Sequence, residues 1–465
     1  MISLPYNPSS KDSIISYAKK LIGKNLKEFC PKDISNSKNK GGFGQFLEKY
    51  YFLYEPNSLE EPDFSLAKLE LKSSPLKELK NLKFVSKERL VLNIINYMDI
   101  VNQDFEFSSF YKKNKNLLLV FYLHKVDETV FDYKIKIVDE WNFPSLDLEL
   151  IKQDFLRIKE KILNGKAHEL SEADTLYLGA CTKGSKGGNK REQPNSNIKA
   201  KQRAFSLKQG YVNHIIASLS GNKEKYGKVI DNLEVLKKKT FEEVILDKFK
   251  AYYGKTVSQI INDLNIELNS KAKNFYANLT KAILNIKQDC EIEEFKKADI
   301  EVRTVRLKNN NLPKEDISFK AFKYEDIMRQ NWNSSEFKEI LEKKFLFIFF
   351  KYYGDELKLE KVKFWNISND DLQIVRRMWV DTKKVIISGN IVKEIKTDKN
   401  GKIKRYTNFP SKKDNYISHV RPHGQNSQDV FALPIEDKLT REKFYTKHCF
   451  WLNASYVKEK IFKDI

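Results

Sequence analysis

The stretch Asp63-Phe-Ser-Leu-Ala-Lys-Leu-Glu70-Leu-Lys72 combines a strand pattern with acidic and basic side chains. Residues 66–73 alternate in polarity, which predicts a strand with one buried face. Because residues i and i+2 of a strand share a face, we expect Glu70 and Lys72 to point the same way and the leucines beside them to point into the core. A turn or a preceding strand would return Asp63 to the side of Glu70.

This grouping of side chains is suited to hydrolysis of a phosphodiester. Two carboxylates at one point make a hard-oxygen site of the kind that Mg²⁺ prefers. A metal-bound water has a lowered pKa, and a lysine beside it can orient or deprotonate that water. The alternative is a solvated strand face in a chain that is 32% charged. The same Glu-x-Lys spacing also occurs at Glu78/Lys80, Glu356/Lys358 and Glu394/Lys396.

Two more charged residues could join this group. Aromatic and leucine side chains over residues 43–54 follow i, i+3, i+4, i+7 spacing, which predicts a helix entered through Gly41-Gly42, with Glu48 on its flank. Lys113 precedes the apolar run 117–123, a predicted buried strand, and could contact a phosphate. An ordinary surface glutamate and a solvated lysine cluster are the alternatives.

The chain contains an internal repeat. Five motifs recur in the same order, with separations of 233, 231, 228, 224 and 245 residues along the chain. They begin at Asn36, Leu69, Leu117, Trp141 and Phe205, and recur at Asn269, Ile300, Phe345, Trp365 and Phe450. A shared bias toward Lys, Asn and Leu is the alternative explanation. We predict two related domains, 1–220 and 236–465, joined by a linker over 221–235.

Composition favours a globular protein that meets a polyanion. The 465 residues are 41% hydrophobic, enough for a sizeable core, and carry a net charge of +21, with basic residues in excess in both halves. A protein that is merely basic is the alternative. The mixture of helix and strand patterns in each half predicts an α/β fold, in detail an α+β mixed sheet.

Cysteine spacing and hydropathy argue against three other classes of protein. The four cysteines lie far apart, which disfavours a zinc site and a disulfide framework and fits a reducing cytoplasm. No apolar run approaches the 18 residues needed to cross a bilayer, and the N-terminal stretch lacks the apolar segment of a signal peptide. We therefore expect a cytoplasmic protein.

The motifs of the first half resemble a known family. Lys40-Gly-Gly-Phe-Gly-Gln-Phe-Leu-Glu48, followed by Asp63-Phe and Glu70-Leu-Lys72, is similar to the DNA mismatch-repair endonuclease MutH and its restriction-enzyme relatives. Phe205-x-Leu207-Lys208 also matches. The resemblance covers most of residues 15–217 and, more weakly, the second half. In architecture the chain is most similar to the GATC-cutting type II restriction endonucleases built from two MutH-like halves.

This resemblance implies a PD-(D/E)xK nuclease core duplicated as two MutH-like domains. It implies that Asp63 and Glu70 bind Mg²⁺ and that Lys72 is the catalytic lysine. Glu48 would assist a second metal or the network at the sheet edge. Lys113 matches the later active-site lysine of the family.

The second half departs from the family at its active site. By the repeat, its residues corresponding to Glu48, Asp63, Glu70 and Lys72 are Lys281, Glu294, Glu301 and Arg303. A lysine in the metal site competes with Mg²⁺, and an arginine with a pKa above 12 cannot act as a base. We expect a catalytically decayed domain that binds DNA as an allosteric effector.

Residues 181–203 form a Gly-rich basic segment that could order on a phosphate backbone. A solvated loop is the alternative. Its expected DNA contacts are Lys183, Lys186, Lys190 and Arg191, and the segment also carries Lys199, Lys201 and Arg203. Lys40 matches a family lysine near the DNA.

Sequence-specific reading is expected in the second half. His419-Val-Arg421-Pro422-His423 resembles the base-reading Arg-Pro loop of the family, so Arg421 is the expected base reader, with a structural salt bridge as the alternative. The first half has Leu178-Gly-Ala-Cys-Thr-Lys183 at that place, without Arg-Pro, and Ser206 where MutH has a tyrosine. How the first half reads bases stays open.

Together, these patterns predict a type II restriction endonuclease. It would make Mg²⁺-dependent double-strand cuts at a short palindrome, with GATC implied by the resemblance, and leave 5′-phosphates. Expected partners are double-stranded DNA, a second copy on two DNA sites, and a cognate DNA methyltransferase. The alternatives are a MutH-like repair nickase and a non-catalytic DNA-binding protein.

Overall fold

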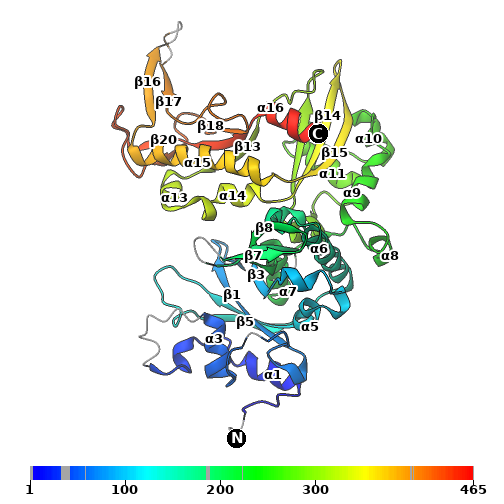
Figure 1. Cartoon of the computed structure of the whole chain (residues 1–465). Coiled ribbons are helices and arrows are strands. Elements are labelled where there is room, and N and C mark those ends of the chain that lie inside the picture. The colour runs from blue at the N-terminus through cyan, green and yellow to red at the C-terminus, as the bar shows by residue number, and fades with distance from the viewer. Residues whose placement is uncertain are drawn as a thin grey trace. The chain divides into compact units, whose positions relative to one another are not determined.

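A computed structural model describes residues 4–32, 42–57, 59–184, 189–221, 224–397, 401 and 403–463. The chain forms two compact units (Figure 1). The first comprises residues 1–245 and 284–300, and the second comprises residues 246–283 and 301–465. No helix in the described ranges is both long and apolar enough to cross a membrane.

The first unit extends past residue 220, where the repeat placed the end of a domain. The carboxylate of Glu294 accepts hydrogen bonds from the amides of Val229 and Ile230. Arg157 pairs with Glu242 at 2.7 Å. These contacts hold both later segments, 221–245 and 284–300, to the first unit.

The first unit is built on a mixed sheet, as expected. Its strand order is β2 (Phe84–Ser86), β1 (Glu70–Glu78), β4 (Asn116–Leu123) and β5 (Ile135–Asn142). Strands β1 and β4 are parallel, with Glu70 opposite Leu117, and the two outer pairs are antiparallel. Residues 117–121 of β4 are fully buried, which confirms the predicted buried strand.

A second sheet of the first unit has the order β3 (Leu90–Ile94), β9 (Arg203–Leu207) and β6 (Leu178–Thr182). Phe205 of β9 packs against Phe155 of the long helix α6 (Ser145–Leu163) and Phe110 of α5 (Ser109–Asn114). A hairpin of β7 (Lys190–Gln193) and β8 (Ser196–Lys201) follows β6 along the chain.

Short helices complete the first unit. They are α1 (Lys11–Lys19), η1 (Leu26–Glu28), α3 (Phe43–Phe46), η2 (Leu47–Tyr51), η3 (Ser65–Ala67), α4 (Tyr97–Ile100), η4 (Phe105–Phe107), η5 (Ala167–Glu169), η6 (Glu172–Asp174), α7 (Gln209–Leu219), α8 (Leu233–Leu236) and α12 (Glu293–Lys297), with the β10 (Tyr226–Gly227) and β11 (Glu291–Ile292) pair. The expected helix after Gly42 is therefore one α-helical turn, α3, that continues as the π-helical turn η2.

The second unit repeats both sheets. β12 (Glu301–Leu307), β14 (Phe345–Tyr353) and β15 (Glu356–Trp365) follow the order of β1, β4 and β5. Glu301 lies opposite Phe345 in a parallel pair, as Glu70 does opposite Leu117. β13 (Ile317–Phe322), β21 (His448–Leu452) and β18 (Ser418–Pro422) follow the order of β3, β9 and β6. The duplication therefore extends to strand order and register.

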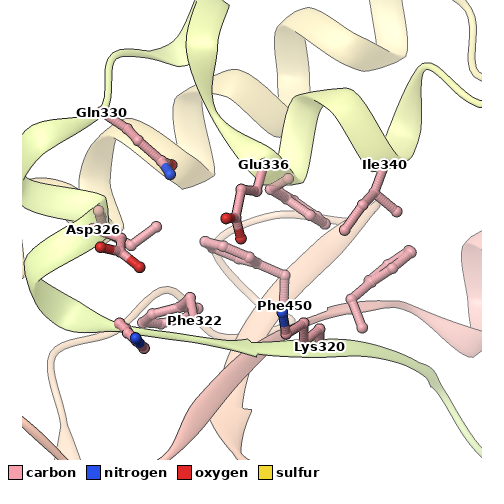
Figure 2. Close-up of a pocket in the computed structure, with 11 residues that line it drawn as sticks. Lys320, Phe322, Asp326, Gln330, Glu336, Ile340 and Phe450 are labelled. Atoms are coloured by element: carbon pink, nitrogen blue, oxygen red, sulfur yellow. The ribbon is translucent and has the colours of Figure 1, made fainter. Parts of the chain in front are cut away.

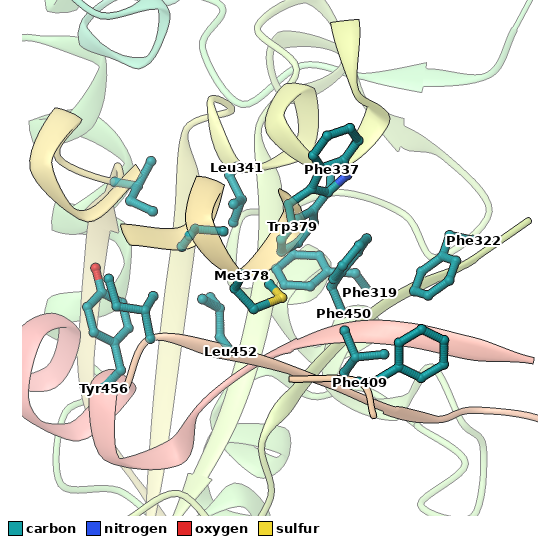
Figure 3. Packing of buried hydrophobic residues seen from close by; sticks show 14 of the residues in the cluster. Phe319, Phe322, Phe337, Leu341, Met378, Trp379, Phe409, Phe450, Leu452 and Tyr456 are labelled. Atoms are coloured by element: carbon teal, nitrogen blue, oxygen red, sulfur yellow. The ribbon is translucent and has the colours of Figure 1, made fainter. Parts of the chain in front are cut away.

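The core of the second unit gathers residues of both of its sheets and of the helix α15 (Asn369–Ser388) (Figure 3). Phe450 of β21 stacks on Phe337 of α14 (Glu336–Leu341) with ring centroids 4.1 Å apart. Trp379 of α15 is 2% exposed. The remaining elements are α9 (Phe241–Lys250), α10 (Val257–Leu264), α11 (Phe275–Ile283), α13 (Tyr324–Arg329), η7 (Trp332–Ser334), β16 (Val392–Thr397), β17 (Ile403–Thr407), β19 (Val430–Ala432), β20 (Phe444–Thr446), α16 (Ala454–Tyr456) and η8 (Val457–Phe462), with α9 spanning the boundary between the units.

The two units share a hydrogen bond between a buried tyrosine and an aspartate. The hydroxyl of Tyr211 donates to Asp147 at 2.9 Å, and that of Tyr456 donates to Asp371 at 2.8 Å. Each aspartate lies in the first turn of the long helix of its unit, α6 or α15. Each tyrosine follows the central strand of the second sheet, β9 or β21. A contact this specific, present twice, supports a common origin of the two halves.

Candidate active site

The site is built at the start of strand β1. The predicted strand over 66–73 is wrong at its beginning, because residues 65–67 form the turn η3 and β1 starts at Glu70. Lys68 adopts a left-handed backbone conformation, and Phe64 bridges Leu69. This turn reverses the chain and returns Asp63 to the side of Glu70.

Asp63 and Glu70 are held together by backbone amides. The amide of Asp63 donates to Glu70 Oε2 at 3.0 Å, and the amide of Leu71 donates to Asp63 Oδ2 at 3.0 Å. Each amide hydrogen bond fixes one oxygen of a carboxylate. The turn therefore orients both side chains before any ligand binds.

Two lysines converge on the Glu70 carboxylate. Lys72 Nζ donates to Glu70 Oε1. Lys113 Nζ, from α5, lies 3.8 Å from the same oxygen and donates to the carbonyl of Leu59 at 2.6 Å. Glu70 is 1% exposed, so its charge is buried and balanced by two ammonium groups.

Burial and like charges raise the pKa values of Glu70 and Glu48. Burial raises the pKa of Glu70 to about 6, and the neighbouring Lys72 opposes that shift. Burial, with the charge of Asp63, raises the pKa of Glu48 on η2 to about 7. These carboxylates are poorly solvated and crowded, so a bound cation would stabilise their charged forms.

Tyr54 is a member of this group that sequence reasoning treated only as part of an apolar stripe. Its hydroxyl is buried and has no hydrogen-bond partner among the described residues. Burial, followed by the charges of Asp63 and Glu48, raises its pKa far above the usual range. The aromatic pattern could not separate this tyrosine from its purely structural neighbours.

The donor set fits a hard divalent cation. Asp63 and Glu70 offer carboxylate oxygens at one point, while no group of three or more His, Cys, Asp or Glu side chains arranged to hold a metal occurs in the described part of the chain. Mg²⁺ commonly takes one or two protein carboxylates and completes its shell with water and phosphate oxygens. A site of this composition therefore suits Mg²⁺ with a phosphodiester.

The corresponding strand of the second unit has a different arrangement. Glu301 of β12 pairs with Arg303 at 3.0 Å. Alignment of the helix α14 with α5 by their capping serines places Ile340 at the position of Lys113. By this alignment, the helix position of Lys113 carries no lysine in the second unit.

Glu294 and Lys281, the residues expected at the Asp63 and Glu48 positions, also differ in setting. Glu294 lies in α12, is 6% exposed, and uses its carboxylate to accept the amides of Val229 and Ile230. Lys281 lies in the last turn of α11. Glu294 thus has a structural role in the first unit.

The expected DNA contacts of the first half lie around the β7–β8 hairpin. Lys190 and Arg191 are exposed on β7, and Lys183 is half-buried just after β6. Lys40 and Lys186 lie outside the described residues. Arg203 is not a phosphate contact, because its guanidinium donates to the carbonyls of Ala180, at 2.5 Å, and Leu170.

Arg421, the expected base reader, lies on β18, where an aromatic ring and a carboxylate hold its side chain. Its guanidinium lies over the Trp451 ring, 3.7 Å from the centroid, and Nη1 is 3.2 Å from Asp316. The arginine side chain is 43% exposed. The structural salt bridge that was the alternative is therefore present, yet much of the arginine side chain still faces solvent. Neither Asp316 nor Trp451 was singled out from the sequence.

A small pocket lies elsewhere in the second unit (Figure 2). Phe322, Ile340 and Phe450 form apolar walls, and Asp326 and Glu336 add two carboxylates. None of its lining residues belongs to the carboxylate–lysine group. Lys320 and Lys323 also line it and balance the two carboxylates.

Comparison with known proteins agrees with this geometry. The family described as DNA mismatch repair enzyme MutH matches residues 52–154 and 285–377, one segment in each half. The type II restriction enzyme Sau3AI of Staphylococcus aureus is 36% identical over 97% of this chain and 98% of that enzyme. The mixed-sheet core, its duplication and this near full-length similarity lead to one conclusion. The chain belongs to the MutH-like type II restriction endonucleases, site-specific deoxyribonucleases with a PD-(D/E)xK core.

Proposed function

We propose that the first unit makes Mg²⁺-dependent double-strand cuts at a short palindrome and leaves 5′-phosphates. The observation that supports this proposal most directly is the convergence of Asp63, Glu70, Lys72 and Lys113 at the start of β1. The GATC sequence is proposed from the resemblance of the catalytic motif to its family.

Each residue of the group has a distinct proposed role. Asp63 and Glu70 would hold Mg²⁺, which when bound would lower the pKa of a water and offset charge on the phosphate. Lys72 exchanges its contact with Glu70 for the attacking water, which it orients. Lys113 offsets charge at the scissile phosphate. Glu48, with a pKa near 7, adds a carboxylate that can hold a proton at neutral pH.

The second unit is proposed as a DNA-binding effector that does not cut. The Glu301–Arg303 pair, with an arginine at the position of Lys72, supports the absence of catalysis there. Exposed Arg421 supports DNA binding. Occupancy of this unit by one site would activate cutting at another, with two copies associating on two sites. A cognate DNA methyltransferase would protect the host sequence.

Plasmid cleavage tests this proposal. Dam-type methylated and unmethylated plasmids are incubated with the full chain and Mg²⁺, and the ends are sequenced. We expect 5′-phosphate ends at one palindrome. Nicks alone would instead support a MutH-like repair nickase, and tight binding without cutting would support a non-catalytic DNA-binding protein.

Two variants locate the chemistry. Lys72→Ala should bind DNA and fail to cut. Lys396→Ala is the matched control, because Glu394 and Lys396 have the same spacing and form an ion pair at 3.0 Å on an exposed strand. Normal cutting by Lys72→Ala would exclude the proposed site.

A further inference from the structure

The second sheets of the two units can be compared position by position. In β3–β9–β6, Leu90, Leu207 and Leu178 lie side by side, and in β13–β21–β18 the same places belong to Ile317, Leu452 and Ser418. This register relates Arg89 to Asp316, Ser206 to Trp451, Gly179 to His419 and Cys181 to Arg421. Since side chains alternate along a strand, all eight belong to corresponding faces.

A turn beside each sheet extends the correspondence. The amide of Ser171 donates to Asp174 at 2.7 Å, and the amide of Ser411 donates to Asp414 at 2.7 Å. These identical turns place Glu172 in the first unit where Lys412 lies in the second.

The strand position of Arg89 and Asp316 and the turn position of Glu172 and Lys412 form an ion pair in each unit, with the charges exchanged. In the second unit Asp316 pairs with Lys412 at 2.7 Å. In the first unit Arg89 pairs with Glu172. An ion pair kept with reversed signs indicates that the cation has moved from the turn to the strand.

In the second unit this pair belongs to the setting of Arg421. Asp316 is 4% exposed and holds Arg421 over the ring of Trp451. In the first unit β6 offers no arginine, because the corresponding residue is the buried Cys181. Arg89 brings a guanidinium to this region from the opposite edge of the sheet.

A glycine in the first unit makes room for the ion pair between Arg89 and Glu172. A Cβ at Gly179 would lie 2.5 Å from Glu172 Oε2, so glycine leaves room for the carboxylate above the strand. The Glu172 side chain is 15% exposed, whereas Arg89 is 38% exposed. A partly buried acid therefore anchors a guanidinium that is more exposed to solvent, or to a ligand, than the acid itself.

We propose that Arg89 reads a guanine in the recognition site of the catalytic unit and that Glu172 is its positioning residue. This inference rests on the proposed function and extends it to the half that lacks the Arg-Pro motif. An arginine fork can make two hydrogen bonds to guanine O6 and N7, and an anchored fork has a fixed direction. A phosphate contact would need only the charge, which a lysine also supplies.

The first test uses single variants and a specificity measurement. Arg89→Ala and Arg89→Lys are compared with the wild type on duplexes that carry the recognition site or one substitution at each of its positions. We expect both variants to lose about 10- to 100-fold in cleavage of the intact site and to lose discrimination at its guanine. A lysine variant with unchanged discrimination would overturn the proposal.

Arg157→Ala is the matched control. Arg157 pairs with Glu242 in the same unit, and the two side chains are 38% and 15% exposed, the same values as for Arg89 and Glu172. We expect this variant to keep its site discrimination. Equal loss of discrimination in Arg157→Ala would show that removal of any such ion pair has this effect, and would overturn the proposal.

A double variant separates base reading from a structural role. Arg89→Asp with Glu172→Lys copies the ion pair of the second unit without its arginine. We expect a wild-type thermal midpoint but no recovery of guanine discrimination. Recovery of both would show that only the ion pair matters. If the wild-type protein itself fails to cut at one site, the proposed function fails; if only these variants cut normally, this inference alone fails.

Discussion

The starts of β1 and β12 occupy the same place in two copies of one sheet, yet their side chains differ in kind. In the first unit, Glu70 meets Lys72 and Lys113 beside Asp63. In the second, Glu301 pairs with Arg303, the arginine two residues on. The scaffold was retained in both copies because it carries the buried core. The active-site side chains contribute little to that core, so they were free to diverge.

The largest expected effect is on catalysis and concerns the first copy alone. Asp63→Asn should slow single-turnover cleavage by roughly 10³-fold or more, because a metal ligand is lost. Glu301→Gln in the second copy should leave the rate at a saturating DNA concentration within about twofold. A large loss from Glu301→Gln would mean that the second copy is also a catalytic site.

The next effect compares Asp147 with Asp371, the aspartates that correspond in the two units. Lys297, 4% exposed, pairs with Asp147 at 2.9 Å and Glu293 at 2.7 Å. Lys297→Met should lower the free energy of unfolding by about 3–5 kcal/mol, because it leaves buried charge unpaired. Asp371 instead accepts from Tyr416, which is exposed, so Tyr416→Phe should cost less than about 1 kcal/mol. Urea unfolding measures the free energy of unfolding of both variants. Equal losses would contradict the claim that the contact to Asp147 stabilises the fold more than the contact to Asp371.

A smaller effect is expected on DNA binding by the second unit. Arg421→Ala, made together with Lys72→Ala to prevent cutting, should weaken binding to the specific duplex by about 10-fold or more. Arg441→Ala is the control, since Arg441 pairs at 3.5 Å with Glu436 and its side chain is 74% exposed. Fluorescence anisotropy at a fixed salt concentration gives both affinities. Unchanged affinity in the Arg421 variant would assign this arginine to structure alone.

The smallest effect is a pH dependence confined to the first copy. The pKa of Glu48 is raised to about 7 in the folded protein, so the folded state binds its proton more tightly than the unfolded state does. Its contribution to stability is full below pH of about 4.5 and is lost as pH rises through about 7. Glu48→Gln should therefore unfold less readily than wild type above about pH 8, by roughly 1–2 kcal/mol, because partial exposure screens the shift.

This pH effect is measured by urea unfolding in EDTA at about pH 5.5 and 8.5. From the lower pH to the higher pH, the wild type should lose stability relative to Glu48→Gln. Added Mg²⁺ should restore the stability of the wild type at the higher pH. Parallel behaviour of both proteins across this range would show that Glu48 titrates normally.

Several features could be predicted from the sequence because they depend on local pattern. The buried strand around 117–123, the grouping of Glu70 with Lys72, and the repeat all follow from residue spacing. Lys113 was a candidate phosphate contact from its place before that strand, with a solvated lysine cluster as the alternative, and the family resemblance gave it an active-site role. The strand start was misplaced because Lys68 turns in the left-handed region, which alternation does not reveal.

Other features were decided only by tertiary structure, because they join residues far apart in the chain. Arg203 lies in a basic segment but donates to carbonyls of neighbouring elements, a choice that composition cannot show. Arg89 and Glu172 are 83 residues apart, and only the strand register shows that they replace Asp316 and Lys412. The sequence determined which side chains exist and their local periodicity; the fold determined which charges meet, since electrostatic contacts depend on distance in space.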